Sequence, residues 1–165
     1  TTLFRSMTKD IPDRRWYGAE PELIAQVIGT PDPQAFCLGG ATMVARFAHL
    51  LSERFNRPLS SFTAILDWGC GVGRLTRYLV GQGPAVTGMG SQPAHMQYCR
   101  TALPAAHFVA MGDTLASGQF DLVLGLSMLP HLSAVLVGWG LAIIVTPFSV
   151  ISGMASPELR SLRQE

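Results

Sequence analysis

The stretch that decides the fold is ILDWGCGVG, residues 65–73. An apolar run ends in Asp67, and glycines follow at every second position, at 69, 71 and 73. A glycine loop between a strand and a helix lets a ligand approach the backbone closely and directs amide groups toward it. The stretch therefore predicts a strand, a ligand-binding loop and a helix, in that order.

The spacing of the glycines argues against two common phosphate-binding loops. A dinucleotide-binding GxGxxG loop that starts at Gly69 would place its third glycine at position 74, which is Arg74. A P-loop requires Lys and then Ser or Thr after its last glycine, and Arg74-Leu75 does not supply them. Asp67 would repel a pyrophosphate and suits a ligand with a positively charged end.

Outward from this loop, apolar segments of strand length alternate with segments of helical period. The pattern predicts strands at 63–66, 85–89, 107–110, 120–125 and 141–146, and helices at 21–28, 32–56, 74–80, 93–102 and 157–162. Such alternation is typical of an α/β fold with a mostly parallel, Rossmann-like sheet and helices on both faces. We expect one compact unit, with a helical lead-in (1–61) and a ligand-binding body (62–165).

Composition narrows the classes of function. The formal net charge is +1, so no basic surface points to nucleic acid. The three cysteines form no Cys-x-x-Cys pair, which argues against a disulfide framework or a structural zinc site. We expect a reducing, cytoplasmic location.

One apolar run complicates this interpretation. Residues 122–151 contain no Asp, Glu, Lys or Arg, and 134–151 is long enough to be a membrane-span candidate. Gly138, Gly140 and Pro147 interrupt it, and 143–145 is β-branched, which favours buried strands instead. We therefore expect no membrane association.

Residues 66–79 (LDWGCGVGRLTRYL) resemble the first motif, D/E-x-G-x-G-x-G, of class I S-adenosylmethionine-dependent methyltransferases. Residues 85–100 resemble the second strand and following helix of that family, and 120–132 its fourth strand and the turn after it. Residues 26–43 resemble a lead-in found in a subgroup. The resemblance implies S-adenosylmethionine as cofactor and methyl transfer to a small-molecule acceptor.

The resemblance also implies which residues form the site. The methionine half of the cofactor and the approach to its ribose would be lined by Asp67, Gly69, Cys70, Gly71 and Gly73. Gly112 and Asp113 would contact the adenine, and Leu126 and Ser127 would face the reaction centre. His131 would be a general base for a hydroxyl or amine acceptor.

Three of these residues also have a purely structural interpretation. Asp67 would then be a turn or cap acid, and Cys70 a small packing residue beside the ligand. His131 would only pack in its turn.

The sequence departs from the family at two places. Where the second strand ends, the family usually places an acid that binds the ribose hydroxyls, and here that position is Gly90, with Gln92 as the nearest polar substitute. After His131 the chain is short, so we expect a sheet shortened at the C-terminal end, without the last antiparallel strands. These departures leave a second hypothesis open: a non-catalytic, methyltransferase-like binding or partner module with weakened cofactor binding.

Overall fold

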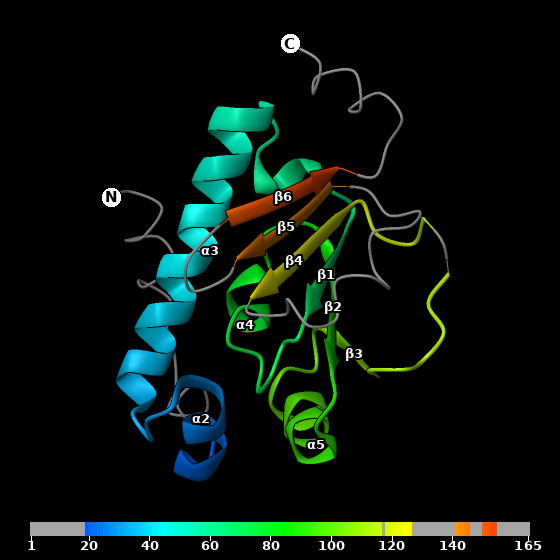
Figure 1. Ribbon diagram of the computed structural model, residues 1–165. Helices are drawn as coiled ribbons and strands as arrows, with labels where there is room; N and C mark the ends of the chain where they lie inside the picture. The colour runs from blue at the N-terminus through cyan, green and yellow to red at the C-terminus, as the bar shows by residue number, and fades with distance from the viewer. Residues whose placement is uncertain (1–18, 117, 127–140, 146–149, 155–165) are drawn as a thin grey trace.

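A computed structural model describes residues 19–116, 118–126, 141–145 and 150–154 (Figure 1). Its helices are α2 (Pro21–Ile28), α3 (Pro33–Phe55), a 3-10 turn (Leu59–Ser61), α4 (Thr76–Leu79) and α5 (Pro93–Ala102). Its strands are β1 (Ala64–Trp68), β2 (Ala85–Gly90), β3 (His107–Ala110), β4 (Leu122–Leu126), β5 (Leu141–Val145) and β6 (Val150–Met154).

The strands form one sheet in the order β3-β2-β1-β4-β5-β6. Every neighbouring pair is parallel except β5 and β6. The chain order reverses direction across β1 and β4, so the carboxyl end of β1 lies at the switch point where open parallel sheets bind ligands. The prediction of a Rossmann-like, mostly parallel sheet is confirmed.

The C-terminal part corrects one prediction. We expected a chain without the last antiparallel strands of the family, but one such strand is present: β6 pairs antiparallel with β5 from Val145↔Val150 to Leu141↔Met154. Antiparallel neighbours need only a short connection, and residues 146–149 are enough to supply it. The parallel step from β4 to β5 has residues 127–140, which meets the length that such crossovers need. The predicted helix at 157–162 lies outside the described residues.

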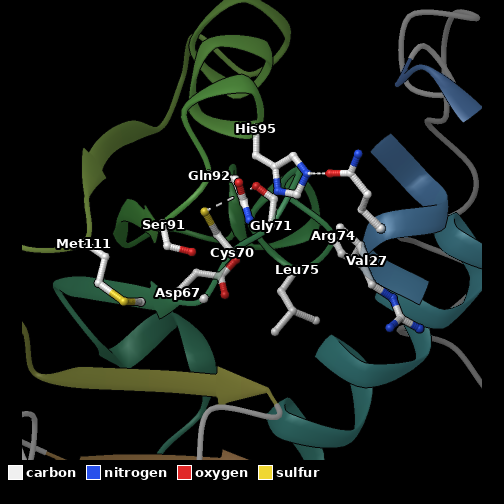
Figure 2. Close-up of a pocket in the computed structure, with 13 residues that line it drawn as sticks. Val27, Asp67, Cys70, Gly71, Arg74, Leu75, Ser91, Gln92, His95 and Met111 are labelled. Carbon is white, nitrogen blue, oxygen red and sulfur yellow. Dashed lines mark hydrogen bonds between the residues drawn. The ribbon is translucent and has the colours of Figure 1, made fainter. Parts of the chain in front are cut away.

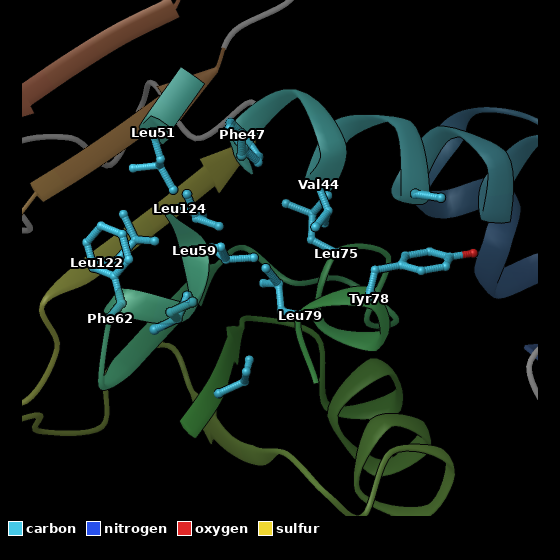
Figure 3. Packing of buried hydrophobic residues seen from close by; sticks show 13 residues of the cluster. Val44, Phe47, Leu51, Leu59, Phe62, Leu75, Tyr78, Leu79, Leu122 and Leu124 are labelled. Carbon is cyan, nitrogen blue, oxygen red and sulfur yellow. The ribbon is translucent and has the colours of Figure 1, made fainter. Parts of the chain in front are cut away.

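Helix α3 covers one face of the sheet (Figure 3). Its buried Val44, Phe47 and Leu51 share one apolar cluster with Ile65 of β1 and Leu122 of β4. Asp32 caps the helix, because its Oδ1 accepts hydrogen bonds from the amides of Gln34 and Ala35. By length and composition alone α3 would also pass for a membrane-spanning helix, but its apolar stripe is buried in this core.

The opposite face of the sheet carries a second apolar cluster, because successive side chains of a strand point to opposite sides. Leu66 and Trp68 of β1 pack there with Phe120 and Val123. Met111, after β3, packs against them. In the described part of the chain α3 and α4 contribute to the first face only, and Met111, Leu115 and Phe120 help to cover the second.

The described parts of the apolar run 134–151 are strands of the sheet. Residues 141–145 are β5, an interior strand of the sheet, and 150–151 begin β6. Strand β5 pairs with a neighbour on each side, β4 and β6, whereas β6 pairs with β5 on one side. Residues 134–140 and 146–149 lie outside the described part.

Candidate cofactor site

The glycine loop follows β1 and adopts a backbone that only glycine tolerates easily. Gly69, Gly71 and Gly73 have φ angles of 80°, 56° and 74°, in the left-handed region. A side chain at Gly73 would also overlap the Leu103 side chain at the end of α5. The alternating glycines are therefore required by the shape of the loop itself.

Backbone hydrogen bonds fix this loop to the neighbouring strand. The amides of Gly69 and Cys70 both donate to the Met89 carbonyl of β2, each at 2.9 Å. The Gly73 amide donates to the Cys70 carbonyl at 2.9 Å. Several of the amides that the sequence suggested for a ligand are thus already used to hold the loop in place.

Arg77 of α4 holds the loop from the other side. Its Nε donates to the Gly73 carbonyl at 2.9 Å, and its Nη2 donates to the Val72 carbonyl at 3.0 Å. The guanidinium lies 4.9 Å from the centroid of the Phe36 ring of α3, and the residue is almost fully buried. Arg77 therefore joins the loop, α4 and α3 into one rigid support, a role that the sequence alone did not indicate.

Asp67 lies at the carboxyl end of β1 beneath the loop, and only 1% of it is exposed. Its Oδ2 accepts hydrogen bonds from the Thr76 amide at 3.0 Å and the Thr76 hydroxyl at 2.5 Å. Burial raises the pKa of the Asp67 carboxyl to about 6, and the bonds from Thr76 oppose this shift. Asp67 thus supports the start of α4, as a cap acid would, and it also lines the pocket described next.

A pocket of about 300 Å³ lies over the loop at the carboxyl edge of the sheet (Figure 2). Its walls come from α2, the glycine loop, the segment after β2 and the residue after β3. The lining residues are Gln26, Val27, Asp67, Gly69, Cys70, Gly71, Arg74, Leu75, Gly90, Ser91, Gln92, His95 and Met111.

Five residues implied by the family resemblance meet in this pocket: Asp67, Gly69, Cys70, Gly71 and Gly90. Gly73 does not line it, since it packs against α5 instead.

The two residues expected at the adenine do not line this pocket. Gly112 and Asp113 are exposed and form a turn, in which the Asp113 carboxylate accepts a hydrogen bond from the Ala110 amide at 2.8 Å. Their neighbour Met111 does line the pocket, and the adenine contact of Gly112 and Asp113 stays a prediction.

The residues expected at the reaction centre are only partly described. Leu126 ends β4, at the same edge of the sheet as the glycine loop. Ser127 and His131 lie outside the described residues.

Gly90 ends β2, where the family resemblance implies an acid. A Cβ atom at this position would lie 2.5 Å from the methyl carbon of Met96 and 3.6 Å from the Cys70 sulfur. The Met96 side chain thus occupies the space into which a larger residue would point. Ser91 and Gln92, which follow, provide neutral polar groups at the pocket instead.

His95 of α5 was not singled out from the sequence. It is 6% exposed, and its Nε2 lies 2.9 Å from the Gln26 Oε1 of α2, a hydrogen bond that joins two walls of the pocket. Burial lowers the pKa of the His95 imidazole. Its position five residues after the end of β2 was the available signal, because that segment begins at the ligand-binding edge of the sheet.

The residues present suit a ligand with both positive and negative groups. Among the described lining residues Asp67 is the only acid, and Arg74 is the cationic group whose Nε is buried without a hydrogen-bond partner. Cys70 is 3% exposed, and a hydrogen bond with Cys99 together with burial raises the pKa of its thiol, which disfavours the thiolate. The site therefore has the features of a binding cradle and lacks an activated nucleophile among its described residues.

Known proteins were compared with the chain. Residues 66–137 match the family model of the methyltransferase domain. No curated protein matches the sequence. Among solved structures, the plantazolicin methyltransferase BpumL, in complex with a pentazolic desmethylPZN analog and SAH, superposes with a TM-score of 0.58 at 19% identity, over 87% of this chain and 56% of that chain. A Thermoplasma acidophilum protein superposes with a TM-score of 0.51 at 16% identity, over 64% of this chain and 61% of that chain.

At these identities the structural likeness bears on the fold alone. The chain spans 56% and 61% of the lengths of these two proteins. The family match begins inside β1, contains the whole glycine loop, and continues past β4. Residues 66–137 of this chain therefore match the methyltransferase domain model, and the sheet has the Rossmann-like fold of methyltransferases such as BpumL.

Proposed function

We propose that this chain binds S-adenosylmethionine in the pocket over the glycine loop and transfers its methyl group to a small-molecule acceptor. The observation that carries the proposal is the buried Asp67 beneath a rigid, left-handed glycine loop at the switch point of the sheet. When bound, this cofactor supplies an electrophilic methyl group on a positively charged sulfur. BpumL, a methyltransferase of similar fold whose structure contains SAH, supports the choice of cofactor.

The protein's part in such a reaction is mainly to bind, orient and exclude water. Asp67 supplies the negative charge of the described pocket, and the glycine loop allows close approach of the backbone. Leu75, Val27 and Met111 supply apolar walls that limit the access of water. Because α2 contributes Gln26 and Val27, we further propose that the lead-in (1–61) closes the pocket as a lid.

His131 is proposed as the general base that takes a proton from the acceptor. Its replacement by asparagine should lower kcat at least tenfold while the affinity for S-adenosylmethionine stays the same. Unchanged turnover in that variant would leave His131 with a packing role only.

A calorimetric titration with S-adenosylmethionine tests the proposal, with Asp67→Ala as the site variant. Loss of the carboxylate should abolish measurable binding, because the pocket then has no described negative charge. Glu53→Ala is the matched control, since Glu53 is an exposed carboxylate of α3 outside the pocket. If the unaltered chain and Asp67→Ala bind with equal affinity, Asp67 and the glycine loop do not bind the cofactor.

A second candidate function has one observation in its favour. Gly90 leaves the end of β2 without a carboxylate, and Met96 fills the space where one would lie. A non-catalytic, methyltransferase-like module that has weakened cofactor binding would show this arrangement. Titration of Gly90→Asp distinguishes the two: binding by this variant but not by the unaltered chain favours the module, whereas methyl transfer by the unaltered chain to any acceptor excludes it.

A further inference from the structure

Two adjacent glycines, Gly39 and Gly40, lie in the interior of the 23-residue helix α3. Each costs about 1 kcal/mol of helix stability relative to alanine, so a packing reason is expected. Neither has the positive φ that would require glycine. The reason for the pair must therefore lie in what packs against them.

The residue that packs against both glycines is Arg74, the first residue after the glycine loop. A Cβ atom at Gly39 would overlap Nη2 of the Arg74 guanidinium. A Cβ atom at Gly40 would overlap the Arg74 carbonyl oxygen and lie 2.9 Å from the Tyr78 ring. The glycine pair thus forms a notch in α3, which we call the Gly39–Gly40 notch, and the Arg74 side chain is seated in it.

Among the described residues, no carboxylate pairs with Arg74. The side chain lines the pocket on the side of α2 and α3 (Figure 2), and its Nε is buried without any hydrogen-bond partner. In the described part of the chain no carboxylate lies within ion-pair distance of it, since the pair found there is Arg57 with Asp121. Burial lowers the pKa of the Arg74 guanidinium. Arg74 is only partly buried, so the cost of desolvating its charge is partial, and a ligand that supplies a negative charge would offset it.

We infer that Arg74, seated in the Gly39–Gly40 notch, recognises the carboxylate of the ligand in this pocket and selects ligands that carry one. The inference rests on the proposed function, in which that carboxylate belongs to the methionine part of S-adenosylmethionine. A planar guanidinium forms paired, charge-assisted hydrogen bonds with a carboxylate, which lysine does not reproduce. Asp67 is the only described acid of the pocket. The site then has a carboxylate for the ammonium group of an amino acid and a guanidinium for its carboxylate.

Two ligands that differ by the carboxylate alone provide the test: S-adenosylmethionine and decarboxylated S-adenosylmethionine. In calorimetric titrations, Arg74→Ala should weaken binding of S-adenosylmethionine roughly 10–100-fold, the range of a lost hydrogen-bonded charge contact. Its affinity for the decarboxylated ligand should change by less than about threefold, because that ligand offers Arg74 nothing to bind. Arg74→Lys keeps the charge but loses the planar pair of donors. Its affinity for S-adenosylmethionine should therefore lie between those of the unaltered chain and Arg74→Ala.

Gly39→Ala tests the notch without altering Arg74. The added methyl group meets the far end of a flexible side chain, so the guanidinium should move while the fold persists. Alanine should also stabilise α3, by up to about 1 kcal/mol at this position. We expect the same ligand-selective loss of affinity in a protein whose urea midpoint is unchanged or raised. Arg46→Ala, which removes an exposed charge of α3 outside the pocket, is the matched control and should bind both ligands normally.

The outcomes separate this inference from the proposed function. If the unaltered chain binds neither ligand, the proposed function fails and the carboxylate assignment fails with it. If the unaltered chain binds but Arg74→Ala leaves the affinity for S-adenosylmethionine intact, only the assignment of Arg74 is overturned. An equal loss for both ligands would also overturn it, because Arg74 would then merely support the pocket.

Discussion

The buried carboxylate of Asp67 should make the stability of this protein fall as the pH rises. Burial raises the pKa of Asp67 from 3.8 to about 6 in the folded chain. Between these two values the native state binds more protons than the unfolded state, so the free energy of unfolding decreases with increasing pH. The difference of about two pKa units corresponds to about 3 kcal/mol, lost between about pH 4 and pH 6.

Asp67→Asn isolates this effect from the other titrating groups. An asparagine oxygen can still accept a hydrogen bond from Thr76, but the side chain carries no titrating proton. We expect the stability of the unaltered chain relative to Asp67→Asn to fall by about 3 kcal/mol from pH 4 to pH 7, with most of the change below about pH 6.5. Urea unfolding followed by circular dichroism at half-unit pH steps measures it. A constant difference between the two proteins across this range would refute the argument that burial of the Asp67 carboxylate outweighs its hydrogen bonds from Thr76.

Three further predictions concern the support of the pocket. Gly73→Ala should destabilise the chain by about 1–2 kcal/mol more than Gly81→Ala in urea unfolding, because both have a positive φ but only Gly73 has a side chain, Leu103, in the way; equal losses would contradict the packing argument. Arg77→Met should cost about 1–3 kcal/mol in the same assay, since the Val72 carbonyl loses its Arg77 donor and the Gly73 carbonyl keeps only the Arg77 backbone amide, and a change below about 0.5 kcal/mol would show that the loop does not depend on the Arg77 side chain. Gly90→Asp should tighten binding of S-adenosylmethionine by about tenfold in calorimetry once Met96 has moved aside, whereas weaker binding would mean that Met96 cannot yield.

The sequence predicted most of the fold because its strongest signals are local. The glycine loop, Pro93 at the start of α5 and the capping Asp32 each mark a boundary that the structure confirms. The helices at 21–28 and 93–102 and the strand at 107–110 have the predicted bounds. The predicted helix 74–80 is shorter, at Thr76–Leu79, because the loop continues through Leu75 as turns that Arg77 holds in place.

What sequence reasoning missed depends on contacts between distant segments. Strand β6 forms by antiparallel pairing with β5, and the residues of β6 alone do not indicate that pairing. Gln26 and His95 meet across 69 positions of the chain, and neither belongs to the motif that identified the loop. The sequence shows a glycine at position 39 but not why one is needed there. The Arg74 side chain leaves no room for a larger residue, and it lies beside Gly39 only because α3 packs against the loop.

The most direct test of the central claim is calorimetric titration of the unaltered chain with S-adenosylmethionine and S-adenosylhomocysteine, beside Asp67→Ala. The account predicts micromolar binding of both ligands by the unaltered chain and no measurable binding by the variant. Absence of binding by the unaltered chain, or equal binding by both proteins, would contradict the claim that the pocket over the glycine loop is a cofactor site.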